Sequence, residues 1–111
     1  MTTEIDTDVL YDLMDAMGDD FAEELLMTFL DEAPGMFDAL TQAVSDGDTD
    51  AFRRAAHSIK SNAQTFGATE LAEQAREMEL SGPTEDPAGD IAGLRTAFNT
   101  AALALKAALD D

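Results

Sequence analysis

Cysteine is absent from the chain of 111 residues, and this absence excludes disulfides, thiolate chemistry and cysteine-based metal sites. A glycine-rich phosphate loop is also missing, because the seven glycines are dispersed and match neither G-x-G-x-x-G nor the Walker pattern. No apolar run approaches the roughly 18 residues that a membrane span needs. The N-terminus, MTTEIDTD, is acidic, whereas a signal peptide opens with basic residues. We therefore expect a soluble cytoplasmic protein without an ATP site or kinase activity of its own.

Lysine and arginine are scarce: six of them stand against 24 Asp and Glu, for a formal net charge of −18. Residues 1–52 carry fifteen Asp or Glu and no Lys or Arg. Such a surface repels the phosphates of nucleic acids and of anionic lipids. The charge therefore argues against nucleic-acid and membrane binding, and it favours solubility.

Apolar residues recur at helical spacing throughout, and no strand alternation is present. The spacing predicts a single all-α domain over residues 1–111, built as a helical bundle. We expect a short N-terminal helix at about 6–17 and longer helices at about 19–46, 48–66, 69–80 and 90–109. The apolar stripe expected in the second of these helices comprises Phe21, Leu25, Phe29, Phe37, Leu40 and Val44.

Helix ends are predicted from glycine, proline and capping side chains. Pro34-Gly35 predicts a kink or a brief break in the second helix. Residues 81–90, SGPTEDPAGD, form the clearest loop, with two Pro and two Gly in ten residues. The expected helix ends are Gly47 and Gly67, and the candidate N-caps are Asp19 or Asp20, Asp48 and Thr69.

The only histidine, His57, lies in RRAAHSIKSNAQTFG, a stretch that holds three of the six basic residues. At about 100° per residue, His57 lies on the opposite side of its helix from the apolar Ile59 and therefore faces solvent. Four polar residues share this exposed strip: Arg53, Lys60, Ser61 and Gln64.

Two explanations of this strip remain open. His57 could be an ordinary surface residue whose basic neighbours offset nearby carboxylates, and the spacing around it matches no metal site. Alternatively, its neutral imidazole could act as a nucleophile. A phosphoryl group on that ring would add nearly two negative charges, and Lys60, one turn away, could compensate them.

The segment AHSIKSNAQTFGATELAEQAREME resembles the signature of the histidine phosphotransfer (HPt) domain family. The family pattern is a His, a Lys three residues later, a small residue next, a Gly ten after the His and a Leu four beyond. A Glu or Gln follows 22 residues after the His. The signature covers about 25 residues, and a weaker match in helix order covers nearly the whole chain. The matching residues are His57, Lys60, Ser61, Gly67, Leu71 and Glu79, with Ser61 where Gly is common.

The resemblance implies an antiparallel four-helix bundle with the short N-terminal helix as a cover. It implies that His57 accepts the phosphoryl group on Nε2 and that Lys60 stabilises this group. Glu79, otherwise an ordinary surface Glu, would orient the ring through Nδ1. The family-like docking strip would include Arg53, Ser61 and Gln64, and Gly67 and Leu71 would be structural.

The implied function is a phosphocarrier, not an enzyme, that relays phosphoryl groups between response-regulator receiver domains in a two-component phosphorelay. One receiver could belong to a hybrid histidine kinase. The chain itself would need no cofactor or metal, since the receiver domain supplies the Asp and the Mg²⁺, and it would be monomeric. Two alternatives remain: a helical adaptor that docks a receiver without chemistry, and the phosphoacceptor domain of a chemotaxis-type kinase.

Overall fold

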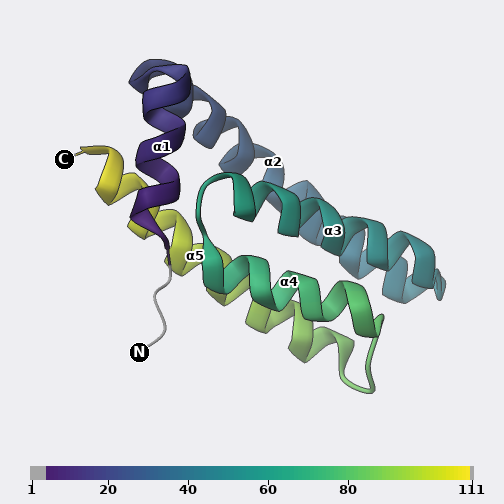
Figure 1. Ribbon diagram of the computed structural model, residues 1–111. Helices are drawn as coiled ribbons and strands as arrows, with labels where there is room; N and C mark the ends of the chain where they lie inside the picture. Colours follow the sequence, from purple (N-terminus) through teal and green to yellow (C-terminus); the bar gives the residue numbers. More distant parts are fainter. Residues whose placement is uncertain (1–4, 111) are drawn as a thin grey trace.

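The computed structural model describes residues 5–110, which contain five α-helices and no strand (Figure 1). Consecutive long helices run antiparallel, and α3 and α4 lie side by side. The four long helices close a ring, because α3 contacts α2 and α4 while α5 contacts the same two helices from the other side. The short α1 packs on α2 and α3. The all-α bundle prediction is confirmed, and the helices are α1 (Thr7–Met17), α2 (Asp19–Asp46), α3 (Thr49–Thr65), α4 (Thr69–Ser81) and α5 (Pro87–Asp110).

The long helix α2 runs unbroken through Pro34, so the break considered at Pro34-Gly35 does not occur. Pro34 is exposed, whereas Ala33 and Phe37 are buried on either side of it. Packing of this inner face therefore holds the two halves together, while solvent can satisfy the backbone carbonyl that the proline leaves without a partner.

The start of α2 also differs from the prediction. Gly18 is the N-cap, with no side-chain cap, and Asp19 and Asp20 lie within the first turn instead. Negative charge is favourable there because the first turn exposes the positive end of the helix dipole. Phe21 is 49% exposed, so its assignment to the core was wrong. The buried stripe runs through Ala22 and Leu26, about 100–140° round the helix from Phe21.

The helix α3 begins as predicted, with the Asp48 side chain accepting a hydrogen bond from Ala51 N at 3.0 Å. Thr69, by contrast, is the first residue of α4 and not its N-cap. Its hydroxyl donates to the Gly67 carbonyl oxygen at 3.1 Å and leaves the cap position to Ala68.

The helix α5 begins at Pro87, a few residues earlier than predicted, so the loop before it is shorter. Proline suits the first helical position, where its missing N–H needs no partner. The Asp86 side chain accepts a hydrogen bond from Gly89 N at 3.1 Å, which satisfies one of the free donors of this helix start.

Phenylalanines join the bundle helices in the core. Phe29 stacks on Phe66 with ring centroids 5.7 Å apart. Phe98 meets Phe29 and Phe37 edge-on, at 5.7 and 5.6 Å. These contacts tie α2 to α5 and to the residue that follows α3. None of the described helices is both long and apolar enough to span a bilayer.

The turn between α3 and α4 is held by the segment before α1. Gly67 has φ +75°, which favours glycine, and its carbonyl accepts a hydrogen bond from Asp6 N at 2.6 Å. A Cβ at this position would lie 2.5 Å from the Asp6 carbonyl oxygen. Two features therefore require glycine at this position: the left-handed backbone conformation and the close approach of the Asp6 carbonyl oxygen. Leu71, four residues on, is fully buried beneath this turn.

Candidate functional site

His57 projects from the middle of α3 toward α4. Its side chain is 55% exposed, while Ile59 on the other side of the helix is buried in the core. His57 Nδ1 lies 2.8 Å from Glu79 Oε2, across a separation of 22 residues. The side-by-side packing of the two helices thus brings together the histidine and the carboxylate that the sequence pattern singled out (Figure 1).

The Glu79 carboxylate also binds Lys60. Lys60 Nζ donates to Glu79 Oε1 at 2.6 Å, so one carboxylate links the imidazole and the ammonium group. The side chains of Lys60 and Glu79 are only 19% and 25% exposed. Lys60 is therefore turned toward α4 and does not stand on the solvent-facing strip that the sequence suggested.

The ionisation of Glu79 determines what the imidazole can do. The hydrogen bond from Lys60 lowers the pKa of Glu79 below its ordinary value of 4.5; partial burial opposes this shift, and the hydrogen bond to His57 adds to it. Glu79 is therefore an anion near pH 7, and a carboxylate only accepts hydrogen bonds. It follows that Nδ1 carries the proton in neutral His57 and that Nε2 has a free lone pair.

The exposed strip on α3 surrounds this nitrogen. Ser61 Oγ lies 3.4 Å from His57 Nε2. Arg53, Arg54 and Gln64 are all exposed on the same helix. Within residues 5–110 the ion pairs are His57–Glu79 and Lys60–Glu79, so neither arginine offsets a neighbouring carboxylate there.

Comparison with known proteins shows to which family the chain belongs. A model of the Hpt domain matches residues 24–111, which is most of the chain. The chain belongs to the Hpt domain family. It is thus a histidine phosphotransfer protein, and the resemblance predicted from residues 56–79 is confirmed.

A solved structure agrees with this assignment. The Hpt domain is similar to the crystal structure of histidine-containing phosphotransfer protein B (HptB) from Pseudomonas aeruginosa PAO1. The similarity covers 99% of this chain and 97% of that one, with a TM-score of 0.87 and 27% sequence identity. No curated protein matches the sequence.

Two exposed residues of this Hpt domain were not singled out from the sequence. Leu80, next to Glu79, is 64% exposed, and Arg76, one turn before Glu79, is also exposed. Each lies two residues, or about 160° round the helix, from the buried Met78, and this helical-wheel signal could have identified both as exposed. Together with Arg53 and Arg54 they expose basic and apolar side chains on α3 and α4.

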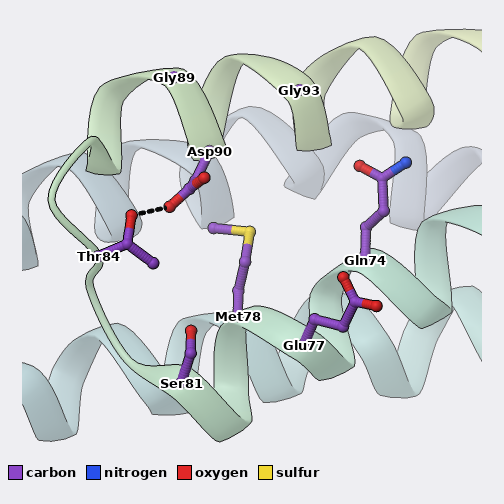
Figure 2. A pocket seen from close by; sticks show the side chains of 8 residues that line it. All are labelled: Gln74, Glu77, Met78, Ser81, Thr84, Gly89, Asp90 and Gly93. Atoms are coloured by element: carbon purple, nitrogen blue, oxygen red, sulfur yellow. Dashed lines mark hydrogen bonds between the residues drawn. The ribbon is translucent and has the colours of Figure 1, made fainter.

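A cleft of about 400 Å³ lies between α4 and the start of α5 (Figure 2). Glu77 lines this cleft. Because Glu77 precedes Glu79 by two residues, the two side chains point about 160° apart on the helix. The cleft is therefore separate from the His57 site. It contains the carboxylates of Glu77 and Asp90 but no basic side chain, so it does not suit a phosphoryl group. Within the described part of the Hpt domain, no group of three or more His, Asp or Glu side chains could hold a metal ion.

Proposed function

We propose that this Hpt domain accepts a phosphoryl group on His57 Nε2 and relays it between response-regulator receiver domains. The observation that carries the proposal is the 2.8 Å contact between His57 Nδ1 and Glu79. Because the carboxylate holds the Nδ1 proton, the nucleophilic lone pair is kept on the other nitrogen, on a half-exposed ring. Glu79 would thereby orient the imidazole, as carboxylates do at other histidine sites.

The transfer step follows from this tautomer. The Nε2 lone pair attacks the phosphorus of a receiver's aspartyl phosphate, and an N–P bond forms. The acyl P–O bond breaks, and its electron pair leaves with the aspartate carboxylate. The Nδ1 proton stays in place, so the ring gains positive charge, which the Glu79 anion stabilises. The reverse step delivers the group to the next receiver, and positioning of the two reactants supplies much of the rate.

Lys60 would act beside the transferring group. Its 2.6 Å hydrogen bond to Glu79 holds the Lys60 ammonium group near the imidazole that the same carboxylate binds. We assign it the stabilisation of the phosphoryl charge. Mg²⁺ would come with the receiver's own acidic site, and no residue of this chain is assigned to hold it.

The exposed basic strip would dock the partner. A receiver's phosphorylation site is acidic, and Arg53 offers it a charge that no carboxylate within residues 5–110 pairs with. Ser61 and Gln64 lie on the same strip, where short or flexible polar side chains allow close approach. The chain would work in the cytoplasm as a monomeric carrier that neither binds nor hydrolyses ATP.

The test is a phosphotransfer profile of wild type and His57→Gln against phosphorylated receiver domains. Wild type should accept the phosphoryl group, and its label should be lost in acid and kept in alkali, as for a P–N bond. His57→Gln should fold normally, as judged by circular dichroism, and accept nothing. Phosphorylation of the variant by a cognate donor would refute the proposal. A wild type that binds receivers but is never phosphorylated would instead be an adaptor.

A further inference from the structure

Ser61 places a hydroxyl group at the reactive nitrogen of His57. Its Oγ is 3.4 Å from Nε2 and has no other hydrogen-bond partner among the described residues. Lys60 Nζ is hydrogen-bonded to Glu79 Oε1 at 2.6 Å. Within residues 5–110, Ser61 is thus the side chain that meets Nε2, while Glu79 meets Nδ1.

The direction of this contact follows from the tautomer. Since Nδ1 carries the proton, Nε2 can only accept, and the Ser61 O–H must donate to it. A hydrogen bond of 3.4 Å is long and therefore weak. It is easily given up when the Nε2 lone pair forms the bond to phosphorus.

Phosphorylation would change the partner of the hydroxyl. Nε2 then has no lone pair, but charged phosphoryl oxygens lie two bonds beyond it, on the phosphorus. A serine hydroxyl rotates freely and can turn to one of these oxygens. Hydrogen bonds to charged acceptors are about twice as strong as those between neutral groups. The exchange replaces a weak hydrogen bond by a stronger one.

We infer that Ser61 stabilises phosphohistidine: its hydroxyl donates to the phosphoryl group on His57 and shifts the transfer equilibrium toward this Hpt domain. The inference rests on the proposed function, because it assumes that His57 Nε2 is the phosphorylated atom. It gives Ser61 a chemical role in addition to the small size that the family position requires.

The test is the equilibrium constant for transfer from a phosphorylated receiver domain that exchanges reversibly with wild type. This constant depends only on the free proteins, so a variant that merely docks differently leaves it unchanged. Ser61→Ala should lower it about five- to tenfold, because the hydrogen bond to the charged phosphoryl group is lost from one side of the equilibrium and only the weaker one to the free imidazole from the other. Ser61→Thr, which keeps the hydroxyl, should stay within about twofold of wild type. The ³¹P resonance of phosphohistidine should move in Ser61→Ala.

Ser58→Ala is the matched control, because Ser58 is an exposed serine next to His57 with no contact to Nε2. It should change neither the equilibrium constant nor the ³¹P resonance. An unchanged constant in Ser61→Ala, or an equal loss in Ser58→Ala, overturns the inference. Failure of the underlying function is distinguishable: wild type would then carry no phosphoryl group on His57, either from receivers or from the chemical donor phosphoramidate.

Discussion

Replacement of Gly67 by alanine should destabilise the fold through two separable effects. A left-handed conformation costs an L-residue roughly 1–2 kcal/mol, and Gly67 has φ +75°. The new Cβ would also lie 2.5 Å from the Asp6 carbonyl oxygen, so the segment before α1 must move away. That movement breaks the hydrogen bond from Asp6 N, worth about 1 kcal/mol, and uncovers part of the buried Ile5.

The two effects together predict a loss of about 3 kcal/mol, which for a domain of this size corresponds to a melting temperature lower by about 12 °C. Gly47→Ala is the matched control, because Gly47 has φ +67° but open space around its Cβ position. It should lose only the conformational part, about 1–2 kcal/mol. Gly35→Ala, inside a helix and also in open space, should raise the stability by up to about 1 kcal/mol.

Thermal and urea unfolding of the three variants, followed by circular dichroism, gives the required free energies. The informative quantity is the difference between Gly67→Ala and Gly47→Ala. If the two variants unfold at the same midpoint, the contact between Gly67 and the segment before α1 contributes nothing, and the explanation given for this glycine is wrong.

Three further predictions concern charge. Because the folded-state pKa of Glu79 is lowered, the carboxylate stabilises the fold above pH 4.5 and loses this effect as the pH falls through that lowered value. The difference in unfolding free energy between wild type and Glu79→Gln should therefore shrink in buffers more acidic than pH 4.5, and a difference that does not shrink there would contradict this. Melting temperature should rise along a chloride series, since fifteen acidic residues without a base in residues 1–52 repel one another; a flat series would contradict this. Lys60→Ala should slow single-turnover transfer about tenfold with unchanged helix content, because a charge beside the phosphoryl group is lost; an unchanged rate would remove Lys60 from the mechanism.

The helices could be predicted from the sequence because each buries a regular stripe of apolar residues. The errors lie at positions where periodicity says little. Phe21 is apolar but falls one residue outside the stripe, on the exposed side of a first turn whose inner side is buried at Ala22. Thr69 is a good capping residue whose hydroxyl finds the Gly67 carbonyl instead. Pro87 was assigned to a loop, although proline is equally suited to the first position of a helix.

The pairing of His57 with Glu79 could be predicted from the sequence, but the other contacts of the candidate site could not. A spacing of 22 residues pointed to Glu79 as the neighbour of His57. No pattern indicates that the same carboxylate holds Lys60, because that depends on how closely α3 and α4 pack. The contact of Ser61 with Nε2 could not be predicted for a similar reason: a serine four residues after a histidine lies near the ring, but the spacing does not indicate where its hydroxyl points.

The tight turn between α3 and α4 fixes which residues of the two helices lie opposite each other at the site. With residues 66–68 held in place, His57 and Glu79 meet because each lies a similar distance up its own helix. One residue inserted between His57 and the turn would shift the imidazole by about 1.5 Å and rotate it by about 100°, away from the carboxylate. The same insertion in the loop at residues 82–86 would leave the site intact, since lengthening a surface loop costs little. Relatives that vary in length should therefore vary there, and keep the hairpin that joins His57 to Glu79 free of insertions and deletions.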